Sequence, residues 1–234
     1  YMLAPKASLG LHPDDAASDP DDDARLETAI SFFEAIFAPD DLVLFRRVES
    51  WTEDGKKRTR IIHNGTAHVP ASREALTREL GRQLTESRLA GANCYFGVCP
   101  RFGAEGQFDL AFQIRIVRVL WADLDHCTAE EARSRIAAAD LPSPSIIVNS
   151  GSGVHLYWLL DEPFLIDDAG APPAVQTEWR DAPDGRRTSH KFVVIDGEKL
   201  ELEQHRHLKR LSPKALHVQN VLAGIAQAIG GDHA

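Results

Sequence analysis

The chain has 234 residues, of which 43% are hydrophobic and 26% are charged, and its net charge is −9. This length and composition allow one large hydrophobic core or two smaller ones, and the lack of any apolar run of about 18 residues argues against a transmembrane helix. The three cysteines, Cys94, Cys99 and Cys127, are too few for a disulfide scaffold and fit a reducing compartment, so we predict a cytoplasmic protein.

The N-terminal part of the chain combines an acidic tail with helices and a hairpin. Residues 1–23 are rich in Ala, Asp and Pro and have no apolar periodicity, so we expect a disordered or extended tail. A helix is predicted from Ala24, because apolar residues recur on one face as far as Phe37. The elements expected after it are a strand at 42–45, a return strand at 60–62 after a turn at Asp54-Gly55, and a capped helix from Ser72 to Gly91.

The rest of the chain alternates between strand and helix patterns. Residues 114–124 are mostly β-branched and apolar, which is typical of a central strand. The other predicted elements are strands at 94–98, 145–148 and 153–160, a helix at 128–139, a hairpin at 190–203, and a helix at 213–229 closed by Gly230-Gly231. This order predicts an α/β (α+β) fold in which a mostly antiparallel or mixed central sheet is flanked by helices.

Two acidic residues end the predicted central strand. The run from Val117 to Ala122 is apolar apart from Arg118, and Asp123 and Asp125 follow it. Strand alternation puts both carboxylates on one face, about 7 Å apart. There they can share one or two divalent cations, as phosphoryl-transfer sites require. Taken alone, the pair also fits a solvated strand end or a helix cap.

A second motif begins at a glycine-rich turn and runs Ser150-Gly151-Ser152-Gly153-Val154-His155. Small residues let the backbone approach a bound group, and successive amides can bind an anion. His155 and Tyr157 share one face of the strand that follows. Taken alone, the same residues favour a glycine-rich hairpin with a hydrogen-bonded core histidine.

Together the two motifs resemble those of the archaeo-eukaryotic primase superfamily, and the likeness is closest to bacterial, plasmid and phage primase-polymerases. The resemblance covers about residues 93–163. The matching segments are Asn93–Arg101, Leu120–Asp125, Ser150–Trp158 and Leu159–Pro163. The resemblance implies a primase-polymerase catalytic fold that contains an RRM-like unit, and a DNA-dependent nucleotidyltransferase that acts as primase and DNA polymerase.

The resemblance also implies the site. Asp123 and Asp125 would hold Mg²⁺ or Mn²⁺ with a third acid, for which Asp232, after Gly230-Gly231, is the candidate; the family's Arg-Leu-Pro-Gly-Thr stretch beyond it is missing from the sequence. His155 would contact the phosphates of the incoming NTP or dNTP. Since phosphates need amides, hydroxyls or cations, further candidates are Ser150, Ser152, Gly153 and Arg101. Arg101 also fits a strand cap or an ion pair with a surface acid.

Template and primer DNA require scattered basic groups rather than a high overall charge. The candidates are Arg46, Arg47, Lys57 and Arg58 beside the first hairpin, and Arg186 and Arg187 further along the chain. Such groups also occur on ordinary solvated faces.

We expect one catalytic domain at 24–234. It would have an insertion at 165–212, because residues 165–190 are too long and polar for an ordinary loop, and it looks truncated at its C-terminal end. Helicase or nuclease domains or proteins of the same replication or defence system are the expected partners. Two other functions remain open: a catalytically idle nucleic-acid-binding module of the same ancestry, and an unrelated glycosyl or phosphoryl transferase with an Asp-x-Asp pair.

Overall fold

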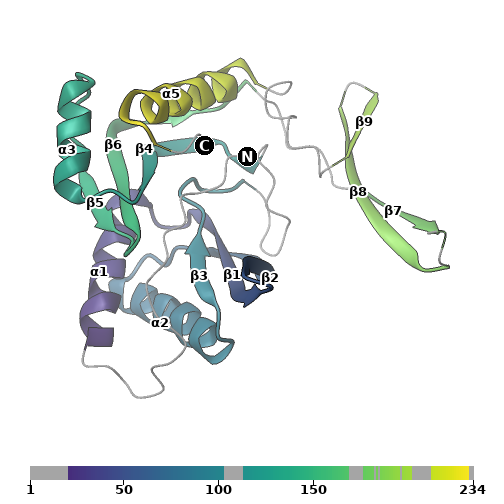
Figure 1. The fold of residues 1–234 in the computed structure, drawn as a ribbon. Coiled ribbons are helices and arrows are strands. Elements are labelled where there is room, and N and C mark those ends of the chain that lie inside the picture. The colour runs from purple at the N-terminus through teal and green to yellow at the C-terminus, as the bar shows by residue number, and fades with distance from the viewer. Residues whose placement is uncertain are drawn as a thin grey trace.

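The computed structural model describes residues 21–102, 113–168, 176–181, 183, 185–195, 197–201 and 212–231. In chain order the elements are α1 (Asp21–Ile36), β1 (Leu42–Glu53), β2 (Lys56–His68), α2 (Arg73–Leu89), β3 (Asn93–Phe96), β4 (Ile116–Asp125), α3 (Ala129–Ala138), β5 (Ile146–Asn149), β6 (Gly153–Leu165), β7 (Gln176–Asp181), β8 (Arg187–Ile195), β9 (Glu198–Glu201) and α5 (Pro213–Ile229). The strands form three antiparallel three-stranded sheets, and helices flank the first two (Figure 1). The predicted α+β class is confirmed, but three sheets replace the single central sheet that we expected.

The first sheet has the strand order β2-β1-β3 and packs against α1 and α2. Its core is aromatic: the Phe33 ring of α1 lies 4.9 Å from the Phe96 ring and 6.0 Å from the Phe45 ring, measured between centroids. The helix begins at Asp21 rather than at Ala24, since acidic residues are favoured in the first turn of a helix.

The second sheet has the order β4-β6-β5, and its two faces differ. One face carries Leu124, Leu156 and Trp158, which pack on α3 and on the end of α5. The opposite face carries Trp121 and Tyr157, which join the core around α1. Because the sheet is covered on both sides, its strands read as nearly continuous apolar runs.

Apart from the third sheet, which lies between β6 and α5 in the chain, the order β4-α3-β5-β6-α5, with β6 between β4 and β5 in the sheet, is that of a β-α-β-β-α-β unit up to its second helix. This is the expected RRM-like arrangement. The pairing of β4 with β6 is irregular between Val117 and Val119, and it therefore has two registers. The outer register pairs Val117 with Phe164, and the inner one pairs Val119 with Leu159.

One ion pair connects the first two sheets. Arg118 of β4 donates from Nε and Nη2 to the two carboxylate oxygens of Asp41, over 3.0 and 3.2 Å. The Asp41 side chain is only 8% exposed, and it also accepts a hydrogen bond from the Ala38 amide. Arg118, the exception in an otherwise apolar strand, is therefore explained by a partner at the start of β1.

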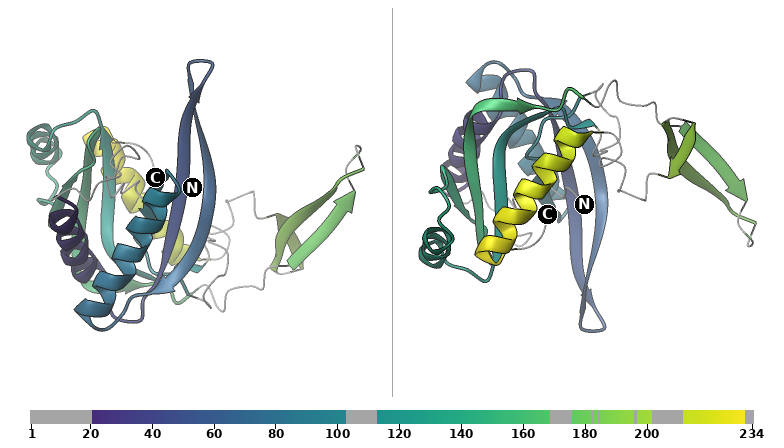
Figure 2. Two further views of the ribbon diagram at one scale, coloured as in Figure 1. Left: turned by 90° about the horizontal axis from the view of Figure 1, so that it is seen from below. Right: turned by 90° about the horizontal axis from the view of Figure 1, so that it is seen from above.

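The third sheet, β7-β8-β9, lies to one side of the other two (Figures 1 and 2). The predicted hairpin at 190–203 is confirmed by β8, β9 and a turn in which Gly197 has a φ of 80°. Strand β7 was not predicted, because its sequence is polar apart from Trp179. The whole sheet falls within 165–212, where an insertion is expected. No helix in the described ranges is long and apolar enough to cross a membrane.

Candidate active site

The site candidates from the two motifs meet on neighbouring strands. Asp123 of β4 is the register partner of His155 of β6, and Asp125 is the partner of Gly153. The distance from His155 Nε2 to Asp123 Oδ1 is 3.5 Å. Asp125 is exposed, the Asp123 side chain is 22% exposed, and His155 is 2% exposed. The two acids therefore lie at the open end of this sheet face, with the histidine beneath them.

Burial determines the charge of His155. It lowers the pKa of the imidazole to about 4, against the opposing effect of the nearby Asp125 charge. The ring is therefore neutral at neutral pH, with one nitrogen towards Asp123. The other nitrogen, Nδ1, is buried and has no hydrogen-bond partner among the described residues. This arrangement differs from that of a core histidine whose two nitrogens are both satisfied by the protein.

Tyr157 continues the same face beyond His155. It is fully buried, and its hydroxyl has no hydrogen-bond partner in the part of the chain that the structure describes. Burial, and next the Asp123 charge, raise its pKa above the usual range. The Phe32 ring of α1 makes an edge contact with the Tyr157 ring at 4.9 Å, so α1 covers this end of the face. Sequence reasoning placed Tyr157 on this face but gave it no role.

The glycine-rich turn brings β6 into close contact with β4. An added Cβ on Gly153 would lie 2.1 Å from the Leu124 carbonyl oxygen, so only glycine lets β6 pass this close to β4. The Ser150 amide donates to the Gly153 carbonyl, and the Gly151 amide donates to Asn149 Oδ1. Because these two amides are used inside the turn, the expected run of free successive amides is not formed by them. Phosphate binding by Ser150, Ser152 and Gly153 stays a prediction.

The end of α5 approaches the acid pair. Gly230 caps the helix in the left-handed conformation, with a φ of 68°, and the Gly231 amide donates to the Ala226 carbonyl. A Cβ built on Gly231 would lie 2.8 Å from the Asp123 backbone oxygen. The backbone of Gly231 is therefore in contact with β4 at the level of Asp123. The predicted third acid, Asp232, lies outside the described residues.

Arg101 is hydrogen-bonded to the chain at the start of β1 in the first sheet. Its side chain is buried, Nη1 donates to the Cys99 carbonyl over 2.9 Å, and its amide donates to the Leu42 carbonyl. These contacts are those of the strand-cap alternative, and contact with a nucleotide stays a prediction.

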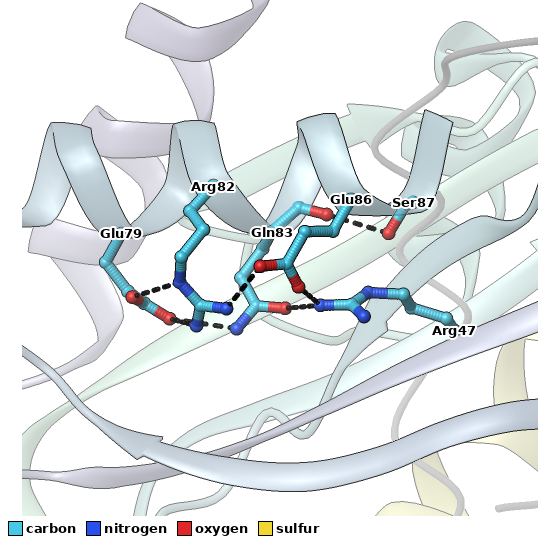
Figure 3. A network of polar contacts seen from close by, with 6 residues as sticks. All are labelled: Arg47, Glu79, Arg82, Gln83, Glu86 and Ser87. Carbon is cyan, nitrogen blue, oxygen red and sulfur yellow. Dashed lines mark hydrogen bonds and ion pairs between the residues drawn. The ribbon is translucent and has the colours of Figure 1, made fainter. Parts of the chain in front are cut away.

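The predicted DNA-binding residues are distributed over two sheets. Arg46 donates to Asn64 across the hairpin. Arg47 is held by α2, where Gln83 and Glu86 accept from its guanidinium within a network that also contains Arg82 and Glu79 (Figure 3). The remaining candidates, Lys57, Arg58, Arg186 and Arg187, are exposed. The guanidinium of Arg47 is therefore bound by α2. The four candidates outside β1 lie on the surface.

The donor set suits a hard divalent cation. Asp123 and Asp125 provide carboxylate oxygens on one strand face, and Mg²⁺ is commonly bound by one or two carboxylates together with substrate phosphates. The described residues contain no cluster of three or more His, Cys, Asp or Glu side chains that could hold a metal ion.

Comparison with known proteins gives one distant neighbour. No family model and no curated protein matches the chain. Among solved structures it is similar to the AEP domain of the primase-polymerase of cyanophage S-2L, with a TM-score of 0.40 and 18% identity. The match covers 60% of this chain and 64% of that domain, which is less than two thirds of the domain's length.

Proposed function

We propose that this protein is a metal-dependent nucleotidyltransferase that joins nucleotides on a DNA template, as a primase and DNA polymerase. One observation carries the proposal: Asp123 and His155 are direct register partners, with Asp125 on the same face at the exposed end of β4. This geometry combines a carboxylate pair with a buried neutral imidazole. The sequence resemblance of residues 93–163 supports the same chemistry.

The chain's own groups would divide the work as follows. Asp123 and Asp125 would hold Mg²⁺ or Mn²⁺, which when bound supplies the charge that activates a 3′-hydroxyl and neutralises the leaving pyrophosphate. His155, neutral because it is buried, would donate a hydrogen bond to a phosphate oxygen without needing to be charged. Its contact with Asp123 would keep the ring in a fixed orientation.

Asp232 is the proposed third ligand. In a β-α-β-β-α-β unit with this strand order, the last strand follows the second helix and lies beside the first strand, which here is β4. Among the described strands, β6 is the sole neighbour of β4. Gly231 already lies against Asp123 on leaving α5. These two facts support a path that brings Asp232 to the acid pair.

Primer extension with labelled dNTPs and Mn²⁺ tests the proposal. Asp123→Asn with Asp125→Asn should reduce incorporation by about three orders of magnitude or more, because it removes the charge that holds the metal. The matched control is Asp161→Asn with Glu162→Gln, two exposed acids of β6, which should leave incorporation unchanged. Incorporation by the folded Asp123/Asp125 variant at the wild-type rate would refute the proposal. DNA binding by the wild type without any incorporation would favour the idle module.

A further inference from the structure

The outer half of the β1–β2 hairpin is not covered by any other part of the chain that the structure describes. Residues 50–64 are all exposed, and Figure 2 shows the hairpin extending past the rest of the molecule. Trp51 is 42% exposed, and Ile61 and Ile62 are exposed as well. An isolated two-stranded hairpin is marginally stable in water, so large apolar side chains on both of its strands indicate a contact outside the described chain. We refer to residues 50–64 as the arm.

Trp51 shares its face of the hairpin with three basic and two acidic residues. Trp51 is the register partner of Arg58, and the neighbouring pairs on the same face are Glu49 with Arg60 and Glu53 with Lys56. Lys56, Arg58 and Arg60 therefore share a face with Trp51, together with the acids Glu49 and Glu53, and Lys57 projects from the other face. An exposed aromatic ring bordered by cations suits a ligand that has both flat rings and negative charges.

The charge of the arm contrasts with that of the whole chain. Residues 50–60 contain four basic and two acidic residues, in a protein of net charge −9. Arg58 and Arg60 pair with Glu53 and Glu49, at 3.4 and 2.6 Å. No partner is found for the Lys56 and Lys57 ammonium groups among the described residues, so they are available to an anion. Exposed ion pairs are weak, and phosphates can compete for the two arginines too.

The position of the cations argues against a protein strand as the partner. Strand β2 is at the edge of its sheet, and charged side chains on an edge strand oppose pairing with a further protein strand. Single-stranded nucleic acid meets both requirements, because its bases stack on exposed aromatic rings and its phosphates bind cations beside them.

We propose that the arm binds single-stranded nucleic acid, with Trp51 as a stacking platform for a base and Lys56, Lys57, Arg58 and Arg60 as phosphate contacts. The inference rests on the proposed function, since it assigns the arm to the template strand of the same enzyme. Trp51 is the residue that it adds.

Fluorescence anisotropy with a labelled oligo-dT strand tests the stacking contact in the full chain. Trp51→Ala should weaken binding about 5- to 150-fold, the range found for loss of one base–aromatic stack, and Trp51→Phe should recover part of the affinity. Leu89→Ala is the matched control, because it removes another exposed apolar side chain, at the end of α2 and away from the arm. Binding by Trp51→Ala within twofold of the wild type would overturn the inference. So would a change of oligomeric state in that variant with binding retained.

The salt dependence of binding tests the phosphate contacts. Lys56→Ala with Lys57→Ala should make the negative slope of log K against log salt shallower by about 1.4, since each single-strand phosphate contact contributes about 0.7 to its magnitude. Arg78→Ala with Arg133→Ala removes the same charge from exposed positions on α2 and α3 and should leave the slope unchanged. Equal slopes for the two double variants would overturn the assignment.

The test of nucleic-acid binding by the arm can be separated from the test of the proposed polymerase activity. Asp123→Asn with Asp125→Asn should bind oligo-dT as the wild type does, because the acids lie on a different sheet from the arm. Loss of binding in Trp51→Ala, in a protein that incorporates no nucleotide, would support the arm and refute the polymerase. Normal binding by Trp51→Ala in an active polymerase would refute the arm alone.

Discussion

Gly153→Ala tests whether close contact between β4 and β6 builds the candidate site. The added Cβ would lie 2.1 Å from the Leu124 carbonyl oxygen and 3.0 Å from the Asp125 Cα. Both are backbone atoms, which cannot rotate away. Relief to ordinary contact requires the two strands to separate by about 1.3 Å, and overpacking of this kind costs up to about 3 kcal/mol. Because Asp125 faces Gly153, the same shift displaces a proposed metal ligand.

Gly151→Ala provides a control two residues away. Gly151 has a φ of 86°, but an added Cβ would meet no atom within 4 Å. The substitution therefore destabilises the protein only through the left-handed conformation, by about 1–2 kcal/mol. Alanine also restricts the unfolded chain, which offsets about 0.5 kcal/mol of that loss. We expect about 1 kcal/mol for Gly151→Ala against about 3 kcal/mol for Gly153→Ala.

Urea denaturation measures the difference between the two variants. With an m-value of about 3 kcal/mol/M, Gly153→Ala should lower the midpoint by about 1 M and Gly151→Ala by about 0.3 M. Under conditions in which both are folded, Gly153→Ala should also reduce nucleotide incorporation by about 100-fold, as expected for an ångström displacement at a reacting centre. If Gly153→Ala proved as stable as Gly151→Ala, the close approach of β4 and β6 could not be the reason that residue 153 is a glycine.

Three further predictions concern single side chains. Arg118→Ala should cost about 3 kcal/mol in urea denaturation, because it leaves the buried Asp41 carboxylate without its ion-pair partner; combining it with Asp41→Asn should recover much of the loss, and a purely additive double variant would contradict this. Tyr157→Phe should leave the free energy of unfolding unchanged or raise it by up to about 1 kcal/mol, since it removes a buried hydroxyl that has no partner in the described residues; a clear loss of stability would mean that the hydroxyl is bonded. Asp232→Asn should reduce incorporation in the primer-extension assay by about 100-fold with no change in thermal unfolding, and an active variant would remove Asp232 from the metal site.

Sequence reasoning succeeded where the signal is local. The helix Pro213–Ile229 was predicted from its apolar residues and from Gly230-Gly231 at its end, and Gly230 does close the helix. The structure adds a cap at its start, where Ser212 accepts from the Ala215 amide. The hairpin turn at Asp54 and Gly55 was predicted in the same way, and both residues have positive φ. Such signals require no knowledge of the rest of the fold.

It failed where the partner is distant in the chain. The sequence of β7 is polar apart from Trp179 and has no apolar alternation that would mark it as a strand, because its pairing with β8 is made by backbone groups. The division into three sheets likewise depends on β3 pairing with β1 rather than with β4. Strand parity put Asp123 and Asp125 on one face of the first strand and His155 on one face of another, without relating the two faces. Only the register of β4 with β6 brings Asp123 opposite His155.

The two registers of the β4–β6 pair bear on how this chain can change in length. The irregularity between Val117 and Val119 separates the inner register, which contains Asp123 and His155, from the outer one, which ends near Leu165. The segment with the third sheet leaves β6 from that outer end. Residues gained or lost at this outer end can be absorbed at the irregularity, as bulges absorb an extra residue. The pairs of the inner register, from Val119 to Asp125, then keep their positions. Homologues should therefore tolerate insertions after Leu165 far better than any between Val119 and Asp125.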